Sequence, residues 1–242
     1  MYTPKQFIEG SYLLIDKPMH WTSFDVIGKI RSPLQKYCNQ KKLKVGHAGT
    51  LDPLATGLLI IVTGSFTKKA EELQTLDKEY IGTITLGGIT PSYDAETEIS
   101  QTFSLENITE EKIITAKEKF TGTIEQVPPI YSSVKVDGRR AYSYARAGEE
   151  LIIKSRNITI YSFEITGIEL PNVHFKVSCS KGTYIRSLAH DLGKELGCGG
   201  YLSSLRRTRV GHFKIEEAIT IDALLASLNP TKFDEIKGFG NM

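Results

Sequence analysis

The stretch Lys44-Val-Gly-His-Ala-Gly-Thr-Leu-Asp52-Pro-Leu-Ala-Thr-Gly57 packs three glycines, a histidine, an Asp-Pro pair and two threonines into fourteen positions. Glycine lowers helix propensity, and Pro53 lacks the amide that a sheet ladder needs, so the pattern predicts an irregular loop. An apolar run of strand length, 58–62, follows at once. Pro53 biases Asp52 away from the helical region and so restricts how its carboxylate points. Taken alone, an Asp-Pro pair beside glycines is more often a simple turn.

The length of 242 residues suits one large domain or two small ones. Hydrophobic residues make up 40% and charged residues 24%, as in ordinary globular proteins. No apolar run is long enough to cross a membrane, and the first residues have no signal-peptide pattern, so we expect a cytoplasmic protein. The three cysteines and five histidines show neither a Cys-x-x-Cys nor a His-x-x-x-His spacing. The spacing therefore gives no argument for a metal site, although a site assembled from distant residues is not excluded by spacing alone.

The net charge of +2 says little about partners, but the distribution of the basic residues says more. Three groups stand out: 29–44, which holds no acid; Arg206, Arg207, Arg209 and Lys214; and Arg139, Arg140 and Arg146 among Tyr142 and Tyr144. Separated basic patches with interleaved aromatics are typical of an RNA-binding surface. Any one patch alone is more often an ordinary solvated face.

Hydrophobic periodicity predicts a mixture of strands and helices. Strands are expected at 12–15, 58–62, 80–86, 158–168 and 173–179, with a strand-like run at 210–215; helices are expected from 22 or 23 until Pro33 ends or kinks the helix, at 66–76, 109–120, 141–147, from 183 to the glycines near 197, and at 219–228, with a further helical turn at 201–205. The segment 132–148 has no clean core period and is expected to be a surface insertion. Because strands and helices alternate in no strict βαβ rhythm, the fold class is predicted to be α+β.

Four residues are candidate partners of Asp52. Arg186, near the start of a helix, would hold a carboxylate ionised and oriented, although a surface ion pair is the simpler interpretation. Tyr80 begins a strand and either faces a pocket or, more commonly, packs in the core. His47 lies in the same loop and could stack or hydrogen-bond. Lys17 could touch phosphate or only solvent.

Five blocks in order resemble the tRNA pseudouridine synthase B family. They are Asp16-Lys17-Pro18 with Thr22-Ser23; the loop 46–57; Lys78-Glu79-Tyr80; Gln126-Val127-Pro128-Pro129 through Ser132, Lys135, Gly138 and 142–148; and 182–188 followed by 205–208 and Val210-Gly211. The resemblance spans roughly residues 12–228, and five ordered blocks make coincidence improbable.

The resemblance implies the pseudouridine synthase fold, a mixed and mainly antiparallel sheet with flanking helices and an RNA-binding insertion at about 126–152. It implies isomerisation of uridine 55 in the T loop of tRNA by base flipping, without cofactor or metal. Asp52 would be the nucleophile, attacking either base or sugar, with Arg186 as its partner. Tyr80 would stack on the flipped base or move a proton, and His47 would help to displace the base. The other expected substrate or RNA contacts are Lys17, which would support the active-site wall, and Gly46, Thr50, Lys135, Arg139, Arg140, Tyr142, Arg146, Tyr184, Leu205 and Arg207.

The sequence departs from the family pattern in three places. His20 stands where the family usually has glycine, and the segment 90–97 keeps only Thr90 and Asp94 of the family motif. Many relatives carry a C-terminal RNA-binding PUA domain, but only a short tail, 229–242, follows the catalytic domain expected at 1–228. We therefore expect the short form, a monomer that needs no protein partner. A non-catalytic tRNA-binding module is an alternative; a synthase that depends on guide RNA is disfavoured because the PUA domain is missing.

Overall fold

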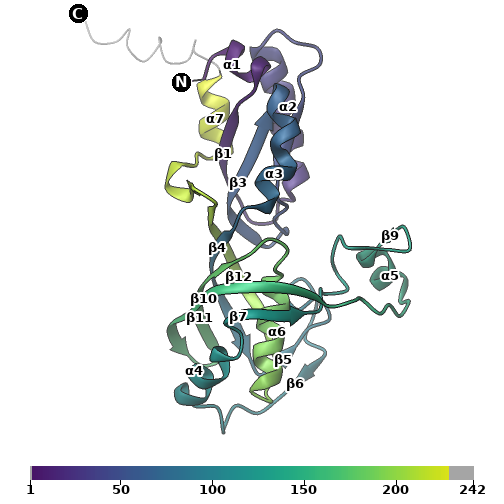
Figure 1. The fold of residues 1–242 in the computed structure, drawn as a ribbon, viewed down its shortest axis with the longest axis vertical. Coiled ribbons are helices and arrows are strands. Elements are labelled where there is room, and N and C mark those ends of the chain that lie inside the picture. Colours follow the sequence, from purple (N-terminus) through teal and green to yellow (C-terminus); the bar gives the residue numbers. More distant parts are fainter. Residues whose placement is uncertain (1, 229–242) are drawn as a thin grey trace, which may run out of the picture. The chain divides into compact units, whose positions relative to one another are not determined.

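The computed structural model describes residues 2–228. It divides the chain into two compact units, which are described separately here (Figure 1). Among the described residues, the first unit comprises 2–76 together with 207–228, and the second comprises 77–206. The single catalytic domain expected at 1–228 thus contains two units, and its boundaries stay a prediction. The tail expected at 229–242 lies outside the described residues.

The first unit is built around one buried strand. Its elements are α1 (Pro4–Glu9), β1 (Tyr12–Lys17), α2 (Ser23–Tyr37), β2 (Val45–Ala48), β3 (Ala55–Thr63), the 3-10 helix η1 (Gly64–Lys69), α3 (Ala70–Thr75), β13 (Phe213–Lys214), the 3-10 helix η2 (Ile215–Glu217) and α7 (Ile221–Ser227). Strand β3 pairs antiparallel with both β1 and β2. The predicted strand 58–62 is confirmed within β3.

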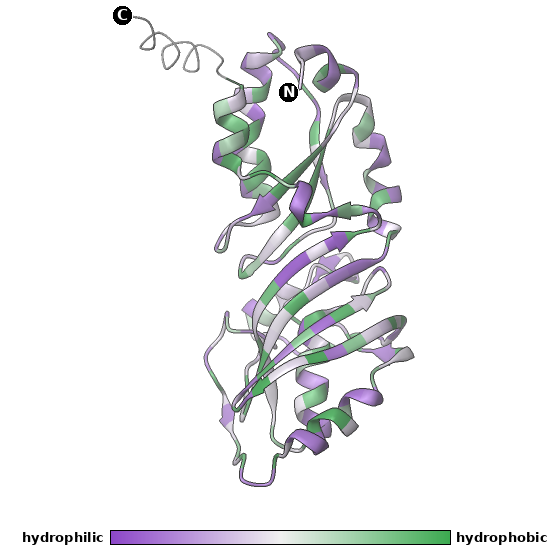
Figure 2. Ribbon diagram, turned by 90° about the vertical axis from the view of Figure 1, so that its left-hand side faces the viewer, coloured by the Kyte–Doolittle hydropathy of each residue, from purple (hydrophilic) through white to green (hydrophobic). Residues whose placement is uncertain are grey.

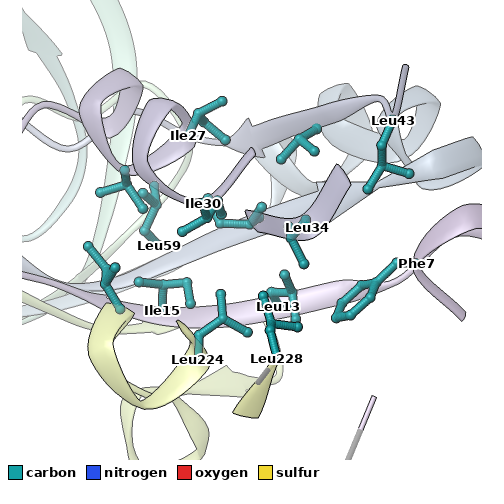
Figure 3. Close-up of a cluster of buried hydrophobic side chains, with 14 of the residues drawn as sticks. Phe7, Leu13, Ile15, Ile27, Ile30, Leu34, Leu43, Leu59, Leu224 and Leu228 are labelled. Carbon is teal, nitrogen blue, oxygen red and sulfur yellow. The ribbon is translucent and has the colours of Figure 1, made fainter. Parts of the chain in front are cut away.

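Both faces of β3 are buried, which explains its continuous apolar run. Leu59 and Ile61 pack into one cluster with residues of α1, α2 and α7, such as Phe7, Leu34 and Leu224 (Figure 3). Alternate residues of β3 pack into a second cluster on the opposite face. In Figure 2 the helices carry both hydrophobic and hydrophilic residues, as expected for helices that cover a core with one face.

The first long helix does not end at Pro33, so that alternative of the prediction is wrong, while a kink at Pro33 stays a prediction. Helix α2 begins at a capping box, in which the Thr22 and Asp25 side chains each bond the other residue's backbone amide, and it runs through Pro33 to Tyr37. A proline deprives the carbonyl four residues earlier of its donor. That residue, Lys29, is exposed, so water can bond the carbonyl. Burial of the apolar face on both sides of Pro33 keeps the helix continuous.

The second unit is an antiparallel sheet with helices. Its elements are β4 (Lys78–Leu86), β5 (Gly88–Ile89), β6 (Gln101–Thr102), α4 (Glu110–Glu118), β7 (Gly122–Gln126), β8 (Lys135–Val136), β9 (Arg139–Arg140), α5 (Ala141–Ala147), β10 (Arg156–Glu169), β11 (Asn172–Cys179), α6 (Ile185–Glu195) and most of β12 (Gly200–Val210). The strand order is β12-β4-β11-β10-β7. The strand predicted at 173–179 is confirmed in β11, where the alternating residues Val173, Phe175, Val177 and Cys179 are buried.

Two local predictions are wrong because strand pairing is not a local property. The residues 201–205, expected to be helical, belong to a strand, β12, which ends at Val210. The polar residues of β12 hide the strand pattern in the sequence. The strand-like run at 210–215 is confirmed in part, because Val210 ends β12 and Phe213–Lys214 form β13, which pairs with it. Likewise Val45–Ala48 lies in the expected loop but pairs with β3 as strand β2, so the irregular part shortens to 49–54.

The segment between β7 and β10 forms the insertion. The chain leaves the sheet after Gln126 and returns at Arg156, and these two residues are paired in the register of the two strands. Between them lie the β8–β9 hairpin and α5, drawn as a separate lobe beside β7 and β10 in Figure 1. Helix α5 spans 141–147 as predicted.

Candidate active site

The irregular loop 49–54, which carries Asp52, is held by a buried arginine. Arg207 is 1% exposed, and its Nε donates to the Leu58 carbonyl at 2.8 Å. Its Nη2 donates to the Gly49 carbonyl at 3.1 Å and its Nη1 to the Thr50 carbonyl at 3.5 Å. One guanidinium therefore joins the start of the loop to the strand that follows it.

The segment before α2 holds the same loop from the other side. The Ser23 hydroxyl accepts from the Leu51 amide at 2.9 Å and lies 3.2 Å from the Leu51 carbonyl. The His20 amide donates to the Pro53 carbonyl at 2.8 Å. His20 has φ 66°, a left-handed conformation that glycine adopts without strain. A glycine, which the resemblance leads us to expect at this position, would adopt the same conformation without strain.

Lys17 is a second buried cation beside the loop. Its side chain is fully buried, and Nζ donates to the carbonyls of Trp21 at 2.5 Å, Pro18 at 2.9 Å and Pro53 at 3.4 Å. Burial lowers the pKa of Lys17 to about 8; the negative charge of Asp52 opposes this, and the positive charge of Arg207 adds to it.

The burial of Lys17 and Arg207 argues against a direct RNA contact by either side chain, so that part of the predicted site stays a prediction without support from the geometry. Both side chains are buried, and their nitrogens are used by backbone carbonyls of the loop and its neighbours. A buried cation bonded in this way has no exposed surface for a phosphate. That Lys17 supports the active-site wall, as the resemblance implied, stays a prediction; its bond to the Pro53 carbonyl and the bonds of Arg207 to the Gly49 and Thr50 carbonyls are compatible with it.

His47 lies in β2, directly before the loop. Its ring is half-buried, and burial, followed by the charge of Arg207, lowers its pKa, which favours the neutral ring at pH 7. Its Nδ1 is buried without a hydrogen-bond partner among the described residues. Gly46 is half-buried and Thr50 is exposed, so these two predicted contacts have surface on the loop and its strand.

In the second unit, Arg186 lies in the first turn of α6 and is 5% exposed. Its Nη1 donates to the carbonyls of Tyr131 at 3.0 Å and Ser92 at 3.2 Å. Its Nε lies 3.5 Å from Oδ2 of Asp94, and both side chains are 6% exposed. Arg186 therefore has a buried carboxylate partner within its own unit.

The sequence analysis did not assign Asp94 to the site. Its carboxylate accepts from the Ser92 hydroxyl at 2.6 Å and the Glu96 amide at 3.0 Å, and the Thr90 hydroxyl donates to the Asp94 carbonyl at 2.7 Å. The available signal was that Thr90 and Asp94 alone kept the family motif in the segment 90–97. The structure shows why these two belong together: they form one buried turn beside Arg186.

The other predicted residues of the second unit differ in exposure. Tyr80 lies in β4 and is 8% exposed; Tyr184 and Leu205 are half-buried. In the insertion, Lys135, Arg139, Arg140 and Arg146 are exposed and Tyr142 is half-buried. The Arg146 guanidinium lies 5.4 Å from the centre of the Tyr142 ring. The insertion thus carries the solvent-facing basic and aromatic surface that the sequence predicted.

The structure brings Asp52, His47, Lys17 and Arg207 together in the first unit, and Arg186 and Asp94 in the second. That Asp52 pairs with Arg186 stays a prediction. Among residues 2–228, no group of three or more histidine, cysteine or acidic side chains is arranged to hold a metal ion. Nor does any helix in this part of the chain have the length and apolar character needed to cross a membrane.

The antiparallel sheet with flanking helices is the pseudouridine synthase fold. A solved structure described as "a Cbf5-Nop10-Gar1 Complex" contains a similar chain, with a TM-score of 0.73 and 32% identity. The similarity covers 97% of this chain but only 59% of that one, so the present chain spans well under two thirds of its length.

Relatives of matching length give a closer comparison. The protein named tRNA pseudouridine synthase B from Flavobacterium johnsoniae is 54% identical over 227 residues, which cover 93% of this chain and 99% of the relative. The protein of the same name from Phocaeicola vulgatus is 47% identical over 230 residues, 95% and 98% of the two chains. Residues 35–185 match the N-terminal domain of TruB family pseudouridylate synthases, and residues 186–236 match the C-terminal domain of tRNA pseudouridylate synthase B. The chain belongs to the TruB family of pseudouridylate synthases.

Proposed function

We propose that this chain isomerises uridine to pseudouridine at position 55 in the T loop of tRNA, with Asp52 as nucleophile. The observation that carries the proposal is the rigid presentation of Asp52. The loop is fastened through the backbone of its other residues, by Arg207, Ser23 and His20. A nucleophile held on such a preorganised loop loses little freedom when substrate binds.

The reaction rearranges the uridine without any net change in composition. The bond from C1′ to N1 breaks, the uracil rotates, and a bond from C1′ to C5 forms; C5 loses its proton and N1 gains one. A covalent bond from Asp52 to either the base or the sugar would tether that fragment to the enzyme while the uracil rotates, and Asp52 is released when the product forms. No cofactor or metal is needed for these steps.

The remaining site residues have roles that suit this chemistry. Taking the target base out of its stack costs a few kcal/mol, and stacking on the Tyr80 ring would return roughly 1–3 kcal/mol. His47, uncharged at pH 7, would occupy the space that the base leaves. Arg186, oriented by Asp94, would supply the counter-charge for Asp52.

The RNA would be gripped mainly through its shape and backbone charge. The exposed basic residues of the insertion, Lys135, Arg139, Arg140 and Arg146, provide cations for phosphates. Binding should therefore weaken with salt. We further propose a cytoplasmic protein that acts as a monomer on free tRNA, without guide RNA or protein partners.

The test compares Asp52→Asn with the unaltered chain on a T-loop RNA, with pseudouridine mapped by position. The expected result is modification at position 55 by the purified chain alone and a loss on the order of 10⁴-fold or more in the variant. RNA binding by the variant should persist, which serves as the folding control. Turnover by Asp52→Asn would exclude Asp52 as nucleophile. Binding without turnover by the unaltered chain would instead favour a non-catalytic RNA-binding module.

A further inference from the structure

The backbone of Tyr184, two residues before Arg186, is hydrogen-bonded by Gln126, the residue that precedes the insertion. The Gln126 side chain, 1% exposed, bonds both sides of this residue. Its Nε2 donates to the Tyr184 carbonyl at 3.1 Å, and its Oε1 accepts from the Tyr184 amide at 2.8 Å. Tyr184 is the N-cap of α6 and makes no side-chain cap bond of its own. The start of the helix that carries Arg186 is therefore fixed by Gln126.

The ring of Tyr184 is held by a second residue, Arg156. The Arg156 guanidinium carbon lies 4.7 Å from the centre of the ring. Nε and Nη2 of this guanidinium are buried, and among the described residues neither has a hydrogen-bond partner. The guanidinium of Arg156 therefore makes a cation–π contact with the face of the Tyr184 ring.

Gln126 and Arg156 flank the insertion at its two ends. Gln126 ends β7, Arg156 begins β10, and the two are paired across the strands. The first residues of the insertion add two more bonds to the first turn of α6. The Ser187 hydroxyl donates to the Val127 carbonyl at 2.7 Å, and Arg186 donates to the Tyr131 carbonyl at 3.0 Å.

We propose that Arg156 is a positioning residue that couples the insertion to the catalytic helix through Tyr184. When RNA binds the basic surface of the insertion, the two ends of the insertion lose mobility. Arg156 and Gln126 lie at these ends and contact Tyr184, so Tyr184 and the start of the helix that carries Arg186 are restrained as well. In this proposal Arg156 acts through the tyrosine ring that it contacts. The inference rests on the proposed function, because the assay that reads it is pseudouridine formation.

The test measures turnover at saturating RNA and the RNA dissociation constant separately. Arg156→Met, which keeps the length of the side chain, should lower turnover about 10- to 100-fold and change the dissociation constant less than about 3-fold. Arg156→Lys should recover part of the turnover, because it keeps a cation over the ring. As a matched control, Lys69→Met removes a cation 4.0 Å from the Phe66 ring in the other unit, and should change neither quantity.

An opposite pattern would overturn the proposal. If Arg156 binds an RNA phosphate directly, Arg156→Met raises the dissociation constant, reduces the slope of log affinity against log salt by about 1, and leaves saturated turnover unchanged. A double-mutant cycle with Tyr184→Leu gives the second criterion: non-additive losses support action through the ring, and additive losses contradict it.

The proposed function can fail without deciding this inference. An unaltered chain that binds RNA but forms no pseudouridine would refute the function alone. The free energy of unfolding in urea would then be measured for the same cycle of Arg156→Met and Tyr184→Leu. Non-additive changes in stability support the positioning contact, and additive changes overturn it, whether or not the chain is active.

Discussion

Replacement of Arg207 by methionine should loosen the loop that presents Asp52. The change removes a guanidinium that is 1% exposed and leaves the Leu58 and Gly49 carbonyls without their donors at 2.8 and 3.1 Å. A hydrogen bond to a charged group contributes roughly 1.5–3 kcal/mol, so the two bonds together account for about 3–6 kcal/mol. Part of this loss is offset because a buried charge is no longer desolvated.

The net expectation is a decrease of about 2–4 kcal/mol in the free energy of unfolding. For a chain of this size, that corresponds to a fall in melting temperature of roughly 4–16 °C. Turnover should fall more than about 10-fold at temperatures where the variant stays folded, because displacing a nucleophile by about 1 Å is enough to lower the reaction rate strongly. RNA affinity should change less than about 2-fold, since the guanidinium is buried.

Urea unfolding, single-turnover kinetics and RNA titration in a series of salt concentrations measure these quantities. Lys214→Met is the matched control, because it removes one positive charge from an exposed position in the same unit. The argument fails if Arg207→Met is as stable as the unaltered chain. It also fails if the variant binds RNA more weakly with a shallower salt dependence, which would return Arg207 to the RNA contacts.

Three further predictions follow from buried charges. Between about pH 8 and 10.5, Lys17 binds more protons in the unfolded chain than in the folded chain, so its contribution to the free energy of unfolding should rise with pH. Urea unfolding at pH 8 and at pH 10.5 should show this rise for the unaltered chain and not for Lys17→Met. Burial raises the pKa of Asp191 from 3.8 to about 6, so its contribution to stability should fall as pH rises across this range, and Asp191→Asn should abolish the fall. Asp94→Asn should lower turnover about 10- to 100-fold with unchanged RNA affinity, because the ion pair with Arg186 is lost; full activity would show that Arg186 needs no such partner.

Local sequence patterns predicted those strands whose burial produces a regular hydrophobic pattern in the sequence. The apolar run 58–62 is buried on both faces of a strand, and the alternation of 173–179 is buried on one. Strand β12 shows no such pattern, because its partners are distant and one of its buried residues is an arginine. Pro33 was misjudged because the cost of a proline depends on whether the carbonyl behind it faces water.

The candidate site divides in the same way. The sequence alone determined the chemical types: a carboxylate in a glycine-rich loop, an arginine at the start of a helix, and a basic, aromatic insertion. The tertiary structure decided which cations are buried and bonded to backbone carbonyls and which are exposed to solvent. Arg207 bonds Gly49, 158 positions away, and Arg186 bonds Ser92, 94 positions away. The chemical type of a side chain is fixed by its identity, but its burial and its partners come from residues that only the folded chain brings near.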